Sequence, residues 1–189
     1  RSIGIMLDCN RRWAKKKGLP SFEGHRRGVE ALRRLQKDFP MLHKKYGLEY
    51  VYLYAFSTEN WNRVKDEVEL LMTLFESGLS EILAVEPANP KEAIRVRVIG
   101  ERERFSPKLQ KLMDDVEART AHNEGGTAVF CLSYGGRAEI LAAANRLIAA
   151  GSPVDEKGFA DALWTSGMPD PELIIRTGGE HRLSNFLPW

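Results

Sequence analysis

The chain has 189 residues, of which 43% are hydrophobic and 29% are charged, as expected for a globular protein with a substantial buried core. No apolar run reaches the roughly 18–20 residues that a membrane-spanning helix needs, and the first residues lack the design of a signal peptide. Cys9 and Cys131 are far apart and form no CxxC motif, which argues against a disulfide framework and a zinc site. We therefore expect a cytoplasmic protein.

The net charge of +2 conceals an uneven distribution. Residues 1–45 carry thirteen Lys or Arg against four Asp or Glu, whereas residues 46–189 carry fifteen against twenty-two. The excess of positive charge predicts an anionic partner near the N-terminal third: a phosphate, a nucleic acid or an acidic membrane surface. For the cations of residues 26–45, an ordinary solvated helix face is an open alternative.

Five apolar segments have the length and composition of β-strands. They cover residues 2–7, 49–56, 94–100, 127–134 and 172–177. In the second segment, every position from 50 to 54 is apolar or aromatic, which is typical of a strand covered by helices on both faces.

Segments with helical periodicity separate these strands. Apolar residues recur every three or four positions over residues 29–42, 68–82, 109–116 and 140–148. Ser106 and Pro107 precede the third segment, where an N-cap serine and a first-turn proline are favoured. Alternating strands and helices predict an α/β fold with a mainly parallel β-sheet flanked by helices.

We expect a single domain over residues 1–189, because the chain has neither internal repeats nor a long linker. The chain stops at residues 187–189 without a signal that ends a helix and without a polar tail. The C-terminal part of the fold is therefore expected to be missing. Ligands of parallel sheets bind at the carboxyl ends of the strands. The loops that follow the predicted strands are therefore the first places to search for a site.

The loop after the first strand places a carboxylate, Asp8, directly before a helix start. A helix N-terminus and the neighbouring Arg11 and Arg12 favour an anion, which Asp8 would hold together with Mg²⁺. The alternative is that Asp8 or Asn10 only caps the helix. There is neither a Walker loop nor a GxGxxG motif, so nucleotide binding is not indicated.

The loop after the second strand, residues 55–63, combines polar groups with Trp61 and Arg63, and Glu67 follows at a helix start. This composition predicts a mobile loop over a ligand. The alternative is an ordinary connection in which Trp61 packs on the helix.

The loop after the last strand has Arg176 and Arg182 on either side of Gly178-Gly179, with Ser184 beyond. Guanidinium groups suit diphosphate oxygens, although a charged surface turn is an alternative. His25 is a candidate base or phosphate donor, but a lone histidine is more often structural. One carboxylate and at least four arginines at three strand ends predict a polyanionic ligand, two diphosphates with one Mg²⁺.

Five motifs run along the chain in a fixed order. They are Asp8-x-Asn10-x-Arg12-Trp13-Ala14, Gly24-His25, Tyr54-Ala55-Phe56-Ser57-x-Glu59-Asn60-Trp61, Tyr134-Gly135-Gly136-Arg137 and Arg176-Thr177-Gly178-Gly179-Glu180-His181-Arg182-Leu183-Ser184-Asn185-Phe186. In these motifs the chain resembles the cis-prenyltransferases, the family of the undecaprenyl diphosphate synthases. The resemblance implies the cis-prenyltransferase fold.

The resemblance also implies roles for residues at matching positions. Asp8 would be the Mg²⁺ ligand, and Asp8, Asn60 and His25 would be catalytic. The allylic diphosphate would lie on Asn10 and Arg12, and isopentenyl diphosphate on Arg176, Arg182 and Ser184. The full set of implied substrate-binding residues is Cys9, Asn10, Arg11, Arg12, Trp13, His25, Ser57, Asn60, Trp61, Arg63, Glu67, Arg176, Arg182 and Ser184.

The implied activity is the condensation of isopentenyl diphosphate with an allylic diphosphate, such as farnesyl diphosphate, to a cis-polyprenyl diphosphate. Such a product would serve as the lipid carrier for cell-wall synthesis. The resemblance further implies a homodimer with an apolar tunnel, which Leu71 and Phe75 would line. No nucleic acid is expected as a partner, and peripheral contact with the inner face of a membrane would serve product release.

The chain departs from the family pattern at four places. Cys9 replaces the usual Gly, Ser21 a basic residue and Ser133 the usual Asn, and the C-terminal segment with its acidic residue is absent. A non-catalytic subunit of the same fold is therefore one alternative. The other is a basic RNA- or membrane-surface-binding module. Such a module would bind its partner without Mg²⁺, and its binding affinity would fall steeply as the salt concentration rises.

Overall fold

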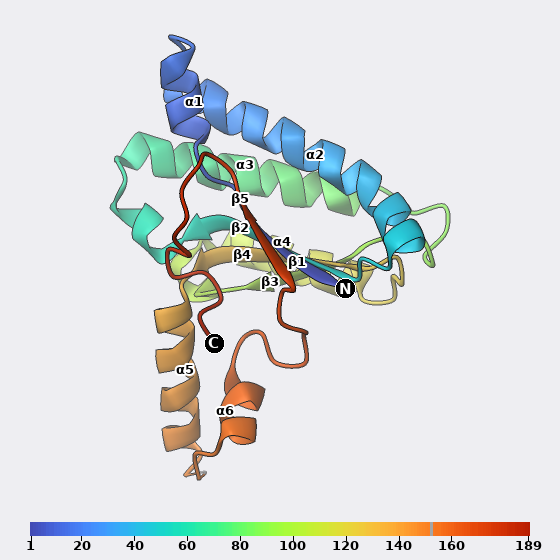
Figure 1. Ribbon diagram of the computed structural model, residues 1–189, viewed down its shortest axis with the longest axis vertical. Coiled ribbons are helices and arrows are strands. Elements are labelled where there is room, and N and C mark those ends of the chain that lie inside the picture. The colour runs from blue at the N-terminus through green and yellow to red at the C-terminus, as the bar shows by residue number, and fades with distance from the viewer. Residues whose placement is uncertain (152) are drawn as a thin grey trace.

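A five-stranded sheet organises the chain, with every neighbouring pair of strands parallel and the order β3-β4-β2-β1-β5. The computed structural model describes residues 1–151 and 153–189, and Figure 1 shows helices on both sides of the sheet. The strands are β1 (Ser2–Met6), β2 (Tyr50–Ser57), β3 (Arg95–Ile99), β4 (Thr127–Tyr134) and β5 (Leu173–Arg176). All five strands predicted from the sequence are confirmed to within one residue at either end.

The helices are α1 (Asn10–Lys16), α2 (Ser21–Tyr46), α3 (Lys65–Ala84), α4 (Pro107–Thr120), α5 (Gly136–Ala149) and α6 (Glu156–Ala162), with the short 3₁₀ helices η1 (Thr58–Asn62) and η2 (Arg102–Arg104). The four predicted helix faces lie in α2, α3, α4 and α5. Ser106 caps α4 as predicted, because its Oγ accepts the Leu109 N–H at 3.2 Å. Helix α6 was not predicted, since seven residues are too few to show an apolar period.

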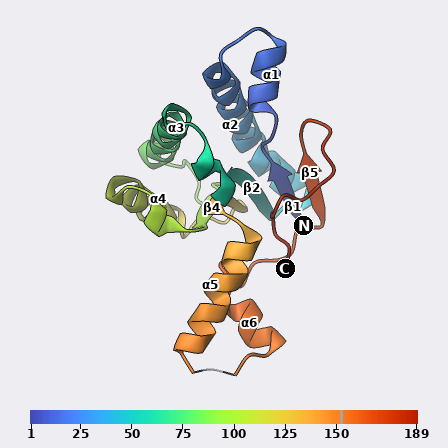
Figure 2. The same ribbon diagram turned by 90° about the vertical axis from the view of Figure 1, so that its left-hand side faces the viewer.

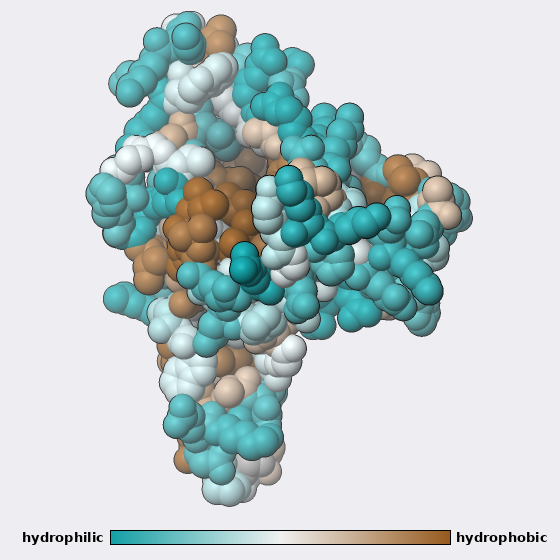
Figure 3. All heavy atoms as spheres, turned by 45° about the vertical axis from the view of Figure 1, so that its right-hand side comes forward, coloured by the Kyte–Doolittle hydropathy of each residue, from teal (hydrophilic) through white to brown (hydrophobic). Residues whose placement is uncertain are grey.

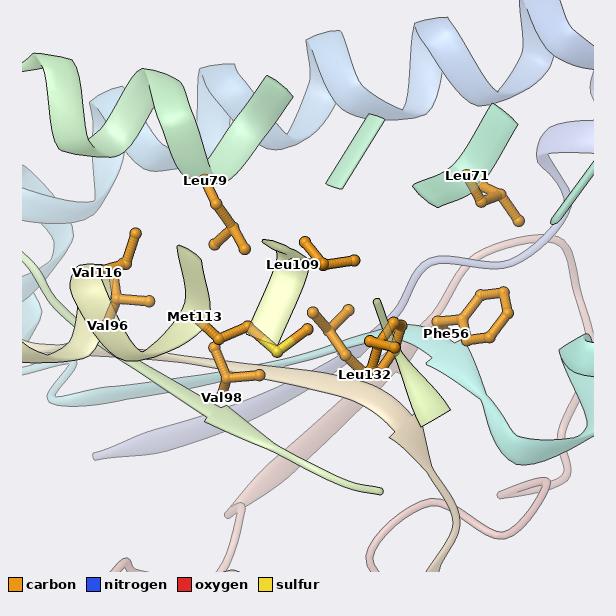
Figure 4. Close-up of a cluster of buried hydrophobic side chains, with 10 residues drawn as sticks. Phe56, Leu71, Leu79, Val96, Val98, Leu109, Met113, Val116 and Leu132 are labelled. Carbon is orange, nitrogen blue, oxygen red and sulfur yellow. The ribbon is translucent and has the colours of Figure 1, made fainter. Parts of the chain in front are cut away.

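One face of the sheet forms the largest part of the core. Helices α3 and α4 pack against it, and their side chains interdigitate with those of β2, β3 and β4 (Figure 4). The buried residues labelled in the figure are Phe56, Leu71, Leu79, Val96, Val98, Leu109, Met113, Val116 and Leu132.

Strand β2 is buried on both faces, as its continuous apolar sequence predicts. Val51 and Leu53 pack beneath Phe39 of α2. Tyr54 points to the opposite face, where its ring stacks on Phe186 with 4.8 Å between centroids. The C-terminal segment therefore covers the second face.

Helices α5 and α6 project away from the sheet on the side opposite α1 and α2 (Figure 2). They pack on each other through Ala143, Leu147, Ala162 and Leu163. Among residues 1–151 and 153–189, no helix is both long and apolar enough to cross a bilayer.

Candidate active site

The strand order brings the three predicted loops together. Strands β2, β1 and β5 are neighbours in the sheet, so the loops after their carboxyl ends meet at one edge. Beside this edge, a cavity of about 1660 Å³ opens between the sheet and helices α2 and α3. Figure 3 shows a hollow with an apolar floor and hydrophilic side chains around it.

The two ends of the cavity wall differ in character. Its mouth carries Asp8, Arg11, Arg12, His25 and Arg176. Farther in, apolar side chains of α2, α3 and the sheet predominate. They include Val29, Leu32, Leu35, Phe39, Leu53, Leu71, Leu74, Phe75, Leu79, Ile82, Val96 and Phe130. Leu71 and Phe75 thus line an apolar space, as the predicted tunnel requires.

An ion pair between Asp8 and Arg176 joins two strand ends at the mouth. Asp8 Oδ2 accepts from Arg176 Nη2 at 2.7 Å and from Nε at 3.1 Å, and Oδ1 accepts the Cys9 N–H at 2.6 Å. Burial raises the pKa of Asp8, but the hydrogen bonds and positive charges around it outweigh burial and hold this pKa below its ordinary value. Asp8 is therefore ionised at neutral pH.

Arginines of the mouth are held by neighbouring carboxylates. Arg176 also donates to Ser184 Oγ at 2.8 Å. Arg12 donates to Glu180 Oε1 at 2.8 Å, and Arg182 donates to the other oxygen of Glu180. Glu180 thereby connects an arginine assigned to the allylic site with one assigned to the isopentenyl site.

His25 lies in a second charged cluster, where α2 meets α3. It is 7% exposed, and its Nε2 lies 3.1 Å from Glu67 Oε1, which also accepts from Arg63 at 2.8 Å. Arg11 lies 3.3 Å from Glu67 Oε2. Burial lowers the pKa of His25 and outweighs the opposing effect of Glu67, so His25 is uncharged at neutral pH.

The loop after β2 is ordered by its own side chains. Asn60 Oδ1 accepts the Ser57 N–H at 3.0 Å in a reciprocal capping box that begins η1. Trp61 packs edge-on against Phe56 at 5.0 Å and donates to Ser133 Oγ at 2.9 Å. Trp61 thus packs at the edge of the core, on Phe56 and Phe105, whereas the alternative interpretation of the sequence places it on the following helix.

Eleven of the predicted site residues line the cavity: Asp8, Cys9, Asn10, Arg11, Arg12, His25, Ser57, Asn60, Arg63, Arg176 and Ser184. Trp13, Trp61, Glu67 and Arg182 are not part of its wall. Trp13 is 40% exposed on α1, whereas Glu67 and Arg182 contact residues that surround the mouth.

Sequence reasoning missed several residues of the same wall. Asn185 accepts the Arg137 N–H at 2.8 Å and donates to Glu59 at 3.3 Å, which links the C-terminal loop to α5 and η1. All three residues line the cavity. Their membership of the quoted motifs was the available signal. A motif by itself, however, does not indicate which of its side chains face the ligand.

Two of the residues that depart from the family pattern have a left-handed backbone conformation. Cys9 has φ 72° and Ser133 has φ 48°, a region that Gly and Asn adopt more readily than other residues. The Cys9 side chain lies against the turn after β5: its Sγ is 3.6 Å from Thr177 O. A Cβ on Gly178 would be only 1.6 Å from this sulfur, so Gly178 leaves the space that Cys9 fills.

On the role that the resemblance implies for this turn, we expect Cys9→Gly to tighten binding of the allylic substrate or raise turnover. The change relieves a left-handed backbone strain of about 1 kcal/mol and removes a side chain from the cavity wall. Kinetics and the melting temperature of the variant, measured beside the parent chain, test this. Cys9→Ala is the matched control, since it keeps the strained Cβ but removes the sulfur. Catalysis that is unchanged or weaker in Cys9→Gly would show that the Cys9 contact with the turn outweighs the strain.

Comparison with known proteins agrees with this geometry. A family model described as putative undecaprenyl diphosphate synthase matches residues 5–189. An isoprenyl transferase of Chromobacterium violaceum is 46% identical over 190 residues, covering 100% of this chain and 73% of the relative. The Micrococcus luteus ditrans,polycis-undecaprenyl-diphosphate synthase, specific for (2E,6E)-farnesyl diphosphate, is 41% identical, covering 100% of this chain and 76% of that protein.

Solved structures show the same likeness. Lavandulyl diphosphate synthase from Lavandula x intermedia, in complex with dimethylallyl diphosphate, has a TM-score of 0.85 and 31% identity, covering 98% of this chain and 80% of that one. A probable undecaprenyl diphosphate synthase from Campylobacter jejuni has a TM-score of 0.77 and 30% identity, covering 98% of this chain and 78% of that one. The fold and the sequence together define an enzyme of the prenyltransferase class. More narrowly, the chain belongs to the undecaprenyl diphosphate synthase family of cis-prenyltransferases, which confirms the resemblance of its motifs.

Proposed function

We propose that this enzyme condenses isopentenyl diphosphate with an allylic diphosphate such as farnesyl diphosphate, and that its cis-polyprenyl product is the lipid carrier for cell-wall synthesis. The observation that carries the proposal is the position of the Asp8–Arg176 pair at the mouth of an apolar cavity of about 1660 Å³. Ordinary small-molecule sites measure roughly 300–1000 Å³. The cavity therefore fits a ligand with a charged head and a long apolar chain.

We assign Asp8 to a Mg²⁺ ion. Its carboxylate is ionised, about one-third exposed and at a strand end. In the described part of the chain, no three His, Cys, Asp or Glu side chains are grouped to hold a metal, so diphosphate oxygens and water would supply most ligands. Mg²⁺ is commonly bound in this way, by one or two carboxylates with substrate phosphates, and would neutralise charge on the diphosphate.

The reaction needs positioning and charge stabilisation rather than a protein nucleophile. The allylic C–O bond breaks, and diphosphate leaves with the electron pair. The isopentenyl double bond attacks the allylic carbon, and loss of a proton from the adduct forms the new double bond. In this assignment Asn10 and Arg12 bind the departing diphosphate, whereas Arg176, Arg182 and Ser184 orient isopentenyl diphosphate.

His25 and Asn60 complete the proposed machinery. Both residues line the cavity. Because His25 is uncharged at neutral pH, it has a single N–H, which points to Glu67 Oε1. His25 would therefore donate to a diphosphate oxygen by turning this N–H away from Glu67. Asn60 is held on η1 by its contact with Ser57, so a change at Asn60 would also loosen this loop.

Product analysis tests the reaction. The chain is incubated with labelled isopentenyl diphosphate, several allylic starters and Mg²⁺, and the products are separated by length. Labelled polyprenyl products that need both substrates and disappear with a chelator are expected. Lack of product with every starter, while the chain still binds the diphosphates, would favour the non-catalytic subunit instead.

We also propose a homodimer that buries the outer face of α5. Leu141 and Ile148 are two turns apart on this helix and are 64% and 73% exposed. Ile148→Glu is expected to convert dimers into monomers, because a dimer would desolvate the new carboxylate. Light scattering measures the change, with Met41→Glu on exposed α2 surface as the control. A mass that is the same in the parent chain and in Ile148→Glu would contradict this interface.

A further inference from the structure

The tip formed by the end of α1, the turn after it and the start of α2 exposes three large apolar side chains. Trp13, Leu19 and Phe22 are 40%, 41% and 45% exposed. The backbone here is well ordered by hydrogen bonds, since the Leu19 N–H donates to Ala14 O at 2.9 Å. These side chains are therefore held outward by a fixed turn, which we call the α1–α2 tip (residues 13–22).

Positive charge surrounds these apolar groups. Lys15, Lys16 and Lys17 are exposed and take part in no ion pair among the described residues. The only acidic residue in residues 10–26 is Glu23, which pairs with Arg26 at 3.2 Å. The tip therefore presents uncompensated cations beside exposed apolar side chains.

The tip occupies one end of the long axis of the molecule, where α1 turns into α2 (Figure 1). It is also continuous with the mouth of the cavity, because Lys15 and Ser21 of the tip belong to the cavity wall, as do the adjacent Arg11 and Arg12. An amphiphile leaving the mouth would emerge beside this surface.

We propose that the α1–α2 tip docks on an anionic lipid membrane. Aromatic and aliphatic side chains on a protruding element enter the interface between headgroups and acyl chains, while lysines bind anionic headgroups. Single-stranded RNA also binds aromatic and basic side chains, but Leu19 offers no ring for base stacking. The inference extends the proposed function, since a polyprenyl product must pass from the cavity into a bilayer.

Vesicle flotation with the whole chain tests the docking surface without any substrate. Phosphatidylcholine vesicles with added phosphatidylglycerol are expected to bind the chain, and phosphatidylcholine vesicles alone are expected to bind it weakly. Leu19→Ser/Phe22→Ser and Lys16→Gln/Lys17→Gln should each lower binding to the anionic vesicles at least about fivefold. Circular dichroism verifies that each variant is folded.

The far end of α2 supplies the matched controls. Met41 and Tyr46 are each 51% exposed, and Lys44 and Lys45 are exposed beside them. Because α2 runs from Ser21 to Tyr46, these groups lie roughly 30–38 Å from the tip along the helix. Met41→Ser/Tyr46→Ser and Lys44→Gln/Lys45→Gln should therefore keep parental binding.

Three results would overturn the docking surface: tip variants that bind like the parent, control variants that lose binding equally, or equal binding to neutral vesicles. Binding of a single-stranded RNA that exceeds vesicle binding and is lost in Lys16→Gln/Lys17→Gln would reassign the tip to nucleic acid. Since the assay contains no prenyl substrate, its failure would leave the proposed reaction standing. Conversely, an inactive chain that binds anionic vesicles through the tip would support the docking surface alone.

Discussion

Asp8→Ala is expected to lower turnover by about a thousandfold or more while the chain stays folded. Asp8 is the carboxylate at the carboxyl end of β1, and its charge would hold the metal that neutralises the diphosphate. The change also leaves Arg176, whose side chain is 10% exposed, without its carboxylate. An unpaired buried group costs about 1–3 kcal/mol, so a moderate loss of unfolding free energy should accompany the loss of rate.

Asp8→Asn is the control that separates the two effects. The amide keeps the size of the side chain and one oxygen near Arg176, so stability should fall less than in Asp8→Ala, although turnover should be nearly as low. Circular dichroism, thermal unfolding and steady-state kinetics measure these quantities. If either variant kept more than about a tenth of the parental rate, Asp8 would have no metal role.

The acid dependence of stability follows from the same ion pair. The folded-state pKa of Asp8 is lowered from 3.8, so its contribution to the unfolding free energy is complete above that value. This contribution is lost as the pH falls through the lowered pKa. The difference in stability between the parent chain and Asp8→Asn should therefore shrink in strong acid.

Arg182→Ala is expected to raise KM for isopentenyl diphosphate far more than KM for the allylic substrate. A lost charge-assisted contact costs roughly 1.5–3 kcal/mol, which corresponds to about 10- to 150-fold in affinity. Of the two assigned arginines, Arg182 gives the more direct test. Its side chain is 65% exposed, and it pairs with Glu180 rather than with the proposed metal ligand. Equal effects on the two substrates would contradict the site assignment.

Arg176→Ala should likewise raise KM for isopentenyl diphosphate, and it should also lower kcat. Arg176 contacts Asp8 as well as Ser184, so its loss would free the proposed metal ligand to move. Arg97→Ala is the control, since this arginine is partly exposed on β3 and pairs with Glu117 away from the mouth. A variant of Arg176 with an unchanged kcat would show that Asp8 keeps its position without the guanidinium.

The sequence by itself determined the order of the strands along the chain and the class of fold, because apolar runs and helical periods are local signals. The buried run at residues 50–54 predicted a strand covered on both faces, and Phe39 and Phe186 cover it. The sequence also located the loops with Asp8 and Arg176, since polar residues that directly follow apolar strands are visible without a structure.

Only the tertiary structure decided which side chains of those loops meet. Asp8 and Arg176 are 168 positions apart, and they form a pair because β1 and β5 are neighbours in the sheet. The same motifs contain Trp13, which points to solvent from α1, and Trp61, which packs on Phe56. The direction of a side chain depends on the packing of elements distant in sequence, and one-dimensional spacing does not record it.

At Cys9, too, the sequence determined one part and the tertiary structure decided the other. The sequence identified Cys9 as a departure from a family glycine, but its φ of 72° and the fit of its sulfur against Gly178 come from the approach of two loops. Local propensity disfavours a left-handed cysteine. The surrounding β1 and β5 turns nevertheless hold it there, because their hydrogen bonds and packing together outweigh the strain of one residue.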